Sequence, residues 1–207
     1  MKEQNAALLI FTRNPELGKG KRRLAATIGD QATLEIYKFL LNHTKTITEP
    51  LQVVKQVWYS EKIHQNDIWP DDVFKKHVQV KGDLGIKMSA AFEKALKEYD
   101  RVVIIGSDLY DLSSQDLNLA FETLNTHDAV IGPATDGGYY LLGFNKNIPK
   151  GIFEDKQWGT GTVYEDTIRD LKKLNYATLE PRNDVDYYED IKDVQAFQPF
   201  LKNIDVK

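Results

Sequence analysis

The sequence predicts an α/β fold in which a central sheet is covered by helices on both faces. Short apolar runs alternate along the chain with longer segments whose apolar residues recur every three or four positions. The runs at residues 6–11 and 102–105 are continuously apolar, as expected of strands buried on both faces of a sheet. In such folds ligands bind beyond the carboxyl ends of the strands. We therefore look for functional residues directly after these two strands.

Length and composition fit one folded domain over residues 1–207. The chain is 42% hydrophobic and contains 9 Phe, 10 Tyr and 3 Trp. A chain of this length buries roughly 70% of its unfolded surface, so it needs neither disulfides nor metals to fold. It contains no cysteine, which excludes disulfides, thiolate metal sites and a cysteine nucleophile.

The first half of the chain begins with the apolar strand and a polar loop at residues 13–22. Residues 30–46 predict a helix, because their apolar side chains fall on one face. Residues 52–59 predict a second strand and residues 77–80 a short third one. A second helix is expected over residues 85–97, which again carry apolar residues at core spacing.

The second half continues the alternation. Residues 101–105 predict the clearest central strand. Ser113 and Asp116 have the spacing of a capping box, which begins a helix that reaches about residue 124. The remaining elements are two strands and two helices, expected in turn at residues 128–131, 139–144, 162–174 and 188–200.

Charge is distributed unevenly on this acidic chain. The net charge is -4, yet residues 1–50 carry 8 Lys/Arg against 5 Asp/Glu. Five cations fall in one short segment: Arg13, Lys19, Lys21, Arg22 and Arg23. The acidic balance argues against general nucleic-acid binding, whereas the local basic segment indicates a small anionic ligand. The N-terminal apolar run is too short for a signal peptide or a membrane span, so we expect a cytoplasmic protein with no membrane partner.

The first loop has the composition of a phosphate-binding loop. Gly18 and Gly20 allow the backbone to approach a ligand, and the cations can neutralise phosphate charge. The loop matches neither the P-loop nor the dinucleotide-binding fingerprint. A solvated basic loop is the alternative, but the position at a strand end favours phosphate binding.

Carboxylates mark two further places. Asp108 follows the central strand directly, where it can bind Mg²⁺ or Mn²⁺, which prefer oxygen ligands; a turn or cap role is the alternative. Asp184 and Asp186 are two residues apart, so in an extended segment they point to the same side and either can complete a metal site. The alternative, which the residues alone favour, is that Asp186 caps the last helix.

A glycine-rich, aromatic bend at residues 132–140 is the third unusual segment. Asp136 and Gly137 are compatible with an ordinary hairpin turn. Asp136 could equally face a sugar or another hydroxylated substrate. Trp158 is followed by Gly159-Thr160-Gly161 and has the setting of an aromatic residue that contacts a ligand.

Taken together, these motifs resemble a known family over residues 8–190. The ordered set is Pro15-x-x-Gly18-x-x-Lys21-x-Arg23-Leu24, Gly82-Asp83-Leu84-Gly85, Gly106-Ser107-Asp108-Leu109, Gly132-Pro133-Ala134-Thr135-Asp136-Gly137-Gly138-Tyr139-Tyr140, Trp158-x-Thr160 and Asp184-Val185-Asp186. It is similar to the small bacterial GT-A family of nucleotide-diphospho-sugar transferases, some of them assigned to arsenosugar biosynthesis. That family is related to molybdenum-cofactor and phospholactate guanylyltransferases.

The resemblance implies a Rossmann-like GT-A fold with a mostly parallel sheet. It implies nucleotide or phosphate binding by Arg13, Gly18, Lys21, Arg23 and Ser107. It implies a substrate pocket lined by Gly137, Gly138, Tyr139, Trp158 and Thr160. Asp108 and Asp186 would hold Mg²⁺ or Mn²⁺, and Asp136 and Asp108 would be the catalytic carboxylates.

Three functions remain open from the sequence. The first hypothesis is a metal-dependent glycosyltransferase that uses a nucleotide sugar and a small-molecule acceptor. The second is a nucleotidyltransferase that joins an NTP to a phosphorylated acceptor and releases pyrophosphate. The third is a non-catalytic nucleotide-binding protein.

Overall fold

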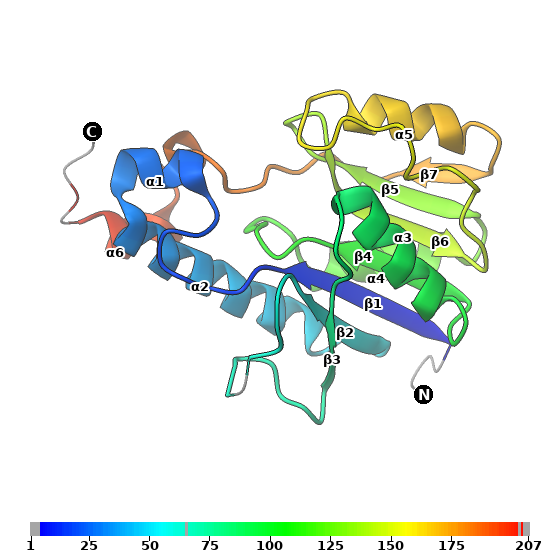
Figure 1. The fold of residues 1–207 in the computed structure, drawn as a ribbon, viewed down its shortest axis with the longest axis horizontal. Helices are drawn as coiled ribbons and strands as arrows, with labels where there is room; N and C mark the ends of the chain where they lie inside the picture. Colours follow the sequence, from blue (N-terminus) through cyan, green and yellow to red (C-terminus); the bar gives the residue numbers. More distant parts are fainter. Residues whose placement is uncertain (1–4, 65, 203, 205–207) are drawn as a thin grey trace.

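A seven-stranded sheet runs through the computed structural model, which describes residues 5–64, 66–202 and 204 (Figure 1). The strand order is β3-β2-β1-β4-β6-β5-β7. The strands are β1 (Ala6–Thr12), β2 (Val54–Tyr59), β3 (Phe74–Val78), β4 (Arg101–Ile105), β5 (Ala129–Pro133), β6 (Tyr139–Asn145) and β7 (Tyr176–Thr178). β6 pairs antiparallel with β4 and β5, whereas the other pairings are parallel. The expected mostly parallel α/β sheet is confirmed.

Helices cover both faces of this sheet, as predicted. The helices are α1 (Arg22–Ile28), α2 (Asp30–Thr48), α3 (Leu84–Ala95), α4 (Ser114–Thr123), α5 (Val163–Leu171) and α6 (Gln198–Leu201), with 3₁₀ turns η1 (Tyr188–Asp190) and η2 (Gln195–Phe197). α2 and α4 pack on one face, and α3 and α5 on the other. Within the described ranges, none of these helices is long and apolar enough to cross a membrane.

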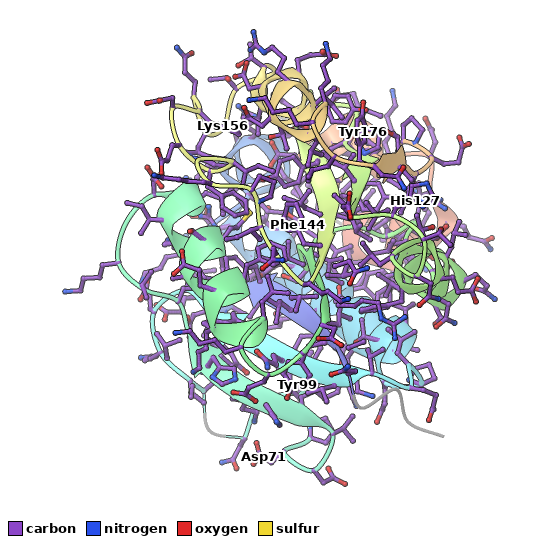
Figure 2. The ribbon with its side chains drawn as sticks, turned by 90° about the vertical axis from the view of Figure 1, so that its right-hand side faces the viewer. Asp71, Tyr99, His127, Phe144, Lys156 and Tyr176 are labelled. Atoms are coloured by element: carbon purple, nitrogen blue, oxygen red, sulfur yellow. The ribbon has the colours of Figure 1, made fainter. Side chains whose placement is uncertain are left out.

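The continuous apolar run of β1 is explained by burial on both sides. Leu8 and Ile10 join the core beneath α2 and α4, whereas Ala7 and Leu9 join the core beneath α3 and α5. Because successive strand residues point to opposite faces, a strand covered on both faces needs apolar side chains at every position. β6 is divided in the same way, with Leu141 in the first of these cores and Leu142 and Phe144 in the second. The fully buried Phe144 lies near the centre of Figure 2.

The structure differs from the predicted elements at four places. α1 and β7 lie in segments for which no element was predicted, and β3 begins at Phe74 rather than at residue 77. The expected helix over residues 188–200 is wrong: that segment consists of η1, η2 and the short α6. Pro199 is the physical reason, because proline is tolerated in the first turn of a helix, where it stands in α6, but not in a helix interior.

The third core cluster explains how this broken segment is held. Leu24 of α1, Ile36 and Leu40 of α2, and Phe197 of η2 are all buried in it. α1 and α6 therefore pack against the side of α2 that faces away from the sheet, and Figure 1 shows both near the same end of α2.

The predicted capping box at the start of α4 is confirmed. The Ser113 hydroxyl accepts a hydrogen bond from the Asp116 amide, and the Asp116 carboxylate accepts one from the Ser113 amide at 2.9 Å. Two amide groups that the helix cannot satisfy internally are paired in this way.

Replacing this cap tests its contribution to stability. Ser113→Ala is expected to lower the free energy of unfolding by about 1 kcal/mol, because one helix amide loses its acceptor. Urea denaturation of wild type and variant measures the difference. Ser89→Ala, within α3, is the control and should change stability by less than about 0.5 kcal/mol. Equal losses in the two variants would contradict the capping role.

Candidate functional site

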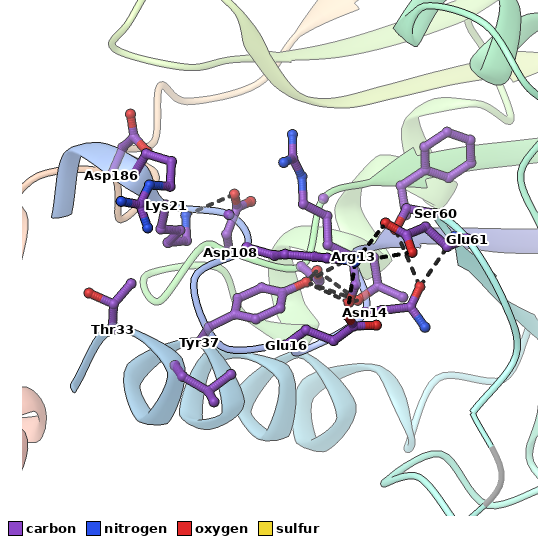
Figure 3. Close-up of a pocket in the computed structure, with 18 of the residues that line it drawn as sticks. Arg13, Asn14, Glu16, Lys21, Thr33, Tyr37, Ser60, Glu61, Asp108 and Asp186 are labelled. Carbon is purple, nitrogen blue, oxygen red and sulfur yellow. Dashed lines mark hydrogen bonds and ion pairs between the residues drawn. The ribbon is translucent and has the colours of Figure 1, made fainter. Parts of the chain in front are cut away.

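A cleft of ≈ 980 Å³ lies at the carboxyl ends of β1 and β4. β1 and β4 are parallel neighbours, so the loops that follow them leave the sheet at the same edge. The cleft is lined by the first loop from Thr12 to Arg23, by residues 106–108 after β4, and by side chains of α2 (Figure 3). Its position agrees with the rule that ligands bind outside the carboxyl ends of strands.

The backbone of the first loop adopts left-handed conformations at three residues. Gly18 has φ 74°, Gly20 has φ 82° and Lys21 has φ 40°. The two glycines adopt this region without steric cost, whereas a residue with a Cβ pays roughly 1–2 kcal/mol. Lys21 is therefore held in a strained backbone conformation at the N-cap of α1.

The Lys21 side chain contacts Asp108 across the cleft. The Lys21 Nζ atom lies 3.0 Å from Asp108 Oδ2, and only 9% of the Lys21 side chain is exposed. Burial alone lowers the pKa of Lys21, but the charges of Asp108, Asp184 and Asp186 outweigh it and raise the pKa above its ordinary value. Lys21 is thus a protonated, buried ammonium group close to three carboxylates.

A second ion pair joins the first loop to residues 184–186. Arg23 Nη1 lies 2.9 Å from Asp186 Oδ2, and the Arg23 guanidinium also lies over the Tyr187 ring. The Val185 amide donates to the Asp108 carbonyl at 3.1 Å, which ties this segment to the end of β4. Both carboxylates predicted as metal ligands therefore contact a cation of the first loop.

A smaller pocket of ≈ 190 Å³ adjoins the cleft. Leu84, Gly106 and Asp108 line both cavities, so Asp108 lies at their junction. The predicted site residues in the smaller pocket are Asp136, Gly138, Tyr139, Trp158 and Thr160. Asp184 lines this pocket, whereas Asp186 lines the larger cleft.

Close backbone packing shapes the wall of the smaller pocket. Gly137 has φ 88°, and a Cβ added there would lie 2.2 Å from the Gly161 carbonyl oxygen. The Tyr164 amide donates to the Gly137 carbonyl at 2.9 Å. The bend between β5 and β6 is therefore clamped onto the start of α5. The two strands are antiparallel, so the bend is a hairpin connection, and the pocket is lined by Asp136 and Gly138 but not by Gly137 between them.

The structure gathers the predicted residues into two groups. The candidates for nucleotide or phosphate binding, namely Arg13, Gly18, Lys21, Arg23 and Ser107, all line the larger cleft. Besides the ion pairs of Lys21 and Arg23, hydroxyl groups of the predicted residues are engaged within the protein. The Ser107 hydroxyl lies 3.3 Å from Thr12 Oγ1, and the Tyr139 hydroxyl donates to Met88 Sδ.

Tyr37 was not among the predicted site residues, and Asp184 was predicted only as an alternative to Asp186. The Tyr37 hydroxyl accepts a hydrogen bond from the Arg13 amide at 2.9 Å and lies 3.4 Å from the Ser107 hydroxyl, so it ties the first loop to the end of β4. Tyr37 lies on the apolar face of its helix, and the sequence therefore indicated only a core residue. The Asp-x-Asp spacing did mark Asp184, but it could not decide between this carboxylate and Asp186.

Burial and like charges act together on Asp184. Burial, followed by the charges of Asp108 and Asp136, raises the pKa of Asp184 to about 6. Negative charge is thus concentrated around Asp108, and Lys21 offsets only part of it.

The carboxylates at this junction have the chemistry of a Mg²⁺ or Mn²⁺ site. Among the described residues, no three His, Cys, Asp or Glu side chains are grouped so as to hold a metal ion. Mg²⁺ in nucleotide enzymes commonly takes one or two protein carboxylates, with phosphate oxygens and water as its other ligands. The donor set of Asp108 and Asp186 fits that description.

Comparison with known proteins agrees with the resemblance seen in the sequence. A family model described as "Uncharacterized protein conserved in bacteria (DUF2064)" matches residues 44–160. A structure from Desulfovibrio desulfuricans G20, provisionally assigned as a nucleotide-diphospho-sugar transferase, is 29% identical with a TM-score of 0.83. The match covers 95% of this chain and 94% of the other. No protein with a curated description matches the chain.

More distant structures share the fold. The inositol-1-phosphate CTP transferase from T. maritima is 11% identical with a TM-score of 0.58, and the match covers 98% of this chain and 97% of the other. The 4-diphosphocytidyl-2C-methyl-D-erythritol synthase from Anaerococcus prevotii DSM 20548 is 9% identical with a TM-score of 0.57, covering 95% and 96%. The Rossmann-like GT-A fold expected from the resemblance is confirmed.

Two glycines separate the effect of close packing from that of backbone conformation. Gly137 and Gly159 both have left-handed φ, but a Cβ at Gly159 would meet no atom within 4 Å. Gly159→Ala is expected to lower the free energy of unfolding by about 1 kcal/mol, and Gly137→Ala by about 2–5 kcal/mol. Urea denaturation measures both. Equal losses would show that the contact with Gly161 is unimportant.

The raised pKa of Asp184 predicts that replacing this residue increases the stability of the protein by an amount that depends on pH. Its pKa rises from 3.8 to about 6 on folding, so the folded state binds this proton more tightly and loses stability as pH rises through that window. Asp184→Asn should therefore be more stable than wild type at pH 7, by about 1–2 kcal/mol after allowance for solvent screening.

This gain should be largely lost by pH 4, which lies well below the folded-state pKa of about 6, and should vanish at pH values below the unfolded-state pKa of 3.8. Chemical denaturation of wild type and Asp184→Asn at pH 4 and pH 7 measures it. The same difference at both values would contradict the assignment.

Proposed function

The chain belongs to the DUF2064 family, and from this membership and the geometry of the two cavities we propose a transferase that acts on a nucleotide-activated sugar. The observation that carries the proposal is that Asp108 lies where the larger cleft, which the cations of the first loop line, and the smaller pocket meet. One sheet supplies both cavities, and we propose that residues 1–207 act as one domain. The provisional assignment of the D. desulfuricans protein supports the same class of reaction.

The nucleotide would occupy the larger cleft. Its diphosphate would lie against Lys21 and Arg23. The residues of left-handed φ in the first loop bring the loop backbone and these cations to the end of β4. Arg13 also lines this cleft, and no carboxylate partner for its guanidinium lies among the described residues. The transferred sugar and the acceptor would then extend into the smaller pocket beside Asp136.

Asp136 would act on an acceptor hydroxyl. Its side chain is exposed to the smaller pocket, and Oδ1 accepts a hydrogen bond from the Gly138 amide at 2.8 Å. The acceptor oxygen would attack the sugar's anomeric carbon, and its proton would pass to Asp136. The bond from that carbon to the diphosphate would break, and the nucleoside diphosphate would leave with the electron pair.

A divalent cation would assist the leaving group. Asp108 and Asp186 would hold Mg²⁺ or Mn²⁺, which when bound offsets charge on the phosphate oxygens. Lys21 and Arg23 would neutralise the same oxygens from the first loop.

Nucleotidyl transfer is the second candidate, favoured by the number of cations in the first loop. Arg13, Lys19, Lys21, Arg22 and Arg23 all line the larger cleft, which suits a triphosphate. A phosphorylated acceptor would attack the α-phosphorus, the bond to the β-phosphate would break, and pyrophosphate would leave. The T. maritima enzyme of the same fold is a CTP transferase, which is compatible with this reaction.

Ligand binding and product analysis distinguish the candidates. A thermal-shift panel of nucleotide sugars and NTPs, with and without Mg²⁺, should identify the donor because a ligand of the native state raises the melting temperature. Glycosyl transfer releases a nucleoside diphosphate, whereas nucleotidyl transfer releases pyrophosphate. Binding of no nucleotide at all would refute both.

Asp108→Asn tests the junction between the cavities. Turnover should fall by at least about 100-fold, because the transition state loses a charged group that organises the phosphates. Asp111→Asn is the control: Asp111 pairs with Arg182 and lines neither cavity. Steady-state rates, with melting temperatures to check folding, decide the outcome. Unchanged turnover in Asp108→Asn would favour a non-catalytic nucleotide-binding protein.

A further inference from the structure

Each carboxylate that would bind a metal already has a cationic partner in this chain. Lys21 Nζ lies 3.0 Å from Asp108 Oδ2, and Arg23 Nη1 lies 2.9 Å from Asp186 Oδ2. Figure 3 shows the Lys21–Asp108 contact as a dashed line. These two cations are also the residues proposed to bind phosphate. Lys21 is the N-cap of α1, and Arg23 lies in the first turn of that helix.

The environment of Lys21 makes this pairing hard to replace by water. Its side chain is only 9% exposed, and removal of an ammonium group from water is costly unless a counter-charge is near. A divalent cation that bound Asp108 would displace Lys21 from its partner and would lie close to a second positive charge. Such repulsion between like charges is strong at short range in a partly buried site.

Nucleotide phosphates would remove this obstacle. A diphosphate in the cleft offers Lys21 and Arg23 new anionic partners, and it leaves Asp108 and Asp186 facing phosphate oxygens of like charge. A divalent cation between these oxygens and the carboxylates would then be favourable.

We propose that Lys21 and Arg23 are internal counter-ions of Asp108 and Asp186. They prevent a divalent metal from binding these carboxylates until nucleotide phosphates bind Lys21 and Arg23 in their place. This inference rests on the proposed function, because it requires that the cleft bind a nucleotide. It assigns to the two residues a coupling role in addition to phosphate binding. Coupling between two ligands is reciprocal, so metal strengthens nucleotide binding by the same factor by which nucleotide strengthens metal binding.

Binding of Mn²⁺ to the nucleotide-free protein tests the proposal. Wild type, Lys21→Met and Arg23→Met are titrated with Mn²⁺, and free Mn²⁺ is followed by electron paramagnetic resonance. Lys21→Met should bind Mn²⁺ at least about 10-fold more tightly than wild type, within the usual range of coupling between sites. Arg23→Met should show a smaller gain, because its ion pair with Asp186 is more exposed.

Lys19→Met is the matched control for net charge. Lys19 lies in the same loop and pairs with Glu16 and Glu61, so its removal also releases carboxylates, but away from Asp108. It should not change Mn²⁺ affinity. Wild type that binds Mn²⁺ as tightly as Lys21→Met would overturn the proposal, and so would an equal gain in Lys19→Met.

Two further measurements keep the outcome clear. Circular dichroism melts check that each variant folds. If Lys21→Met does not fold, the substitution of the exposed Arg23 by Met decides. The proposal is then overturned if Arg23→Met shows no gain in Mn²⁺ affinity. Wild type is also titrated calorimetrically with ADP, CDP, GDP and UDP, first in EDTA and then with Mg²⁺ present. If none of them binds, the proposed function fails, whereas a gain of Mn²⁺ affinity in Lys21→Met would still show the counter-ion role.

Discussion

Because β1 and β4 pair side by side in the same direction, the loops that follow them leave one edge of the sheet together. The site depends on this adjacency, since it brings Lys21 of the first loop to Asp108 after β4 across 87 residues of sequence. The Tyr37 hydroxyl adds a second link, because it contacts both the Arg13 backbone and the Ser107 side chain. The first loop is thereby held against the central strand.

The antiparallel direction of β6 determines where the connection between β5 and β6 lies. β6 is antiparallel to β4, so it begins at the edge where β4 ends. The hairpin that precedes it therefore places Asp136 and Gly138 beside Asp108, and Gly137 closes this bend onto Gly161. A fully parallel sheet would have sent that connection to the opposite edge. The single antiparallel strand is thus what sets a second cavity beside the first.

Cations and carboxylates in the site form pairs with one another. The first loop looks like a free basic patch in the sequence, yet Lys19, Lys21, Arg22 and Arg23 each contact a carboxylate in the folded chain. The net charge of -4 and the local excess of cations are both poor guides to this arrangement. Under the proposal made above, a ligand that enters the cleft would exchange partners with these pairs, and the ion pairs would govern which ligands can bind together.

The sequence by itself determined the α/β class, the capping box of α4 and the three segments that form the site, because local periodicity and strand-end position are properties of neighbouring residues. It did not reveal α1 or β7, and it predicted a last helix that Pro199 breaks. Only the tertiary structure decided that Asp184 and Asp186 line different cavities and that Lys21 and Arg23 pair with carboxylates. The physical reason is that burial and charge pairing depend on residues far apart in the chain, which only the strand order brings together.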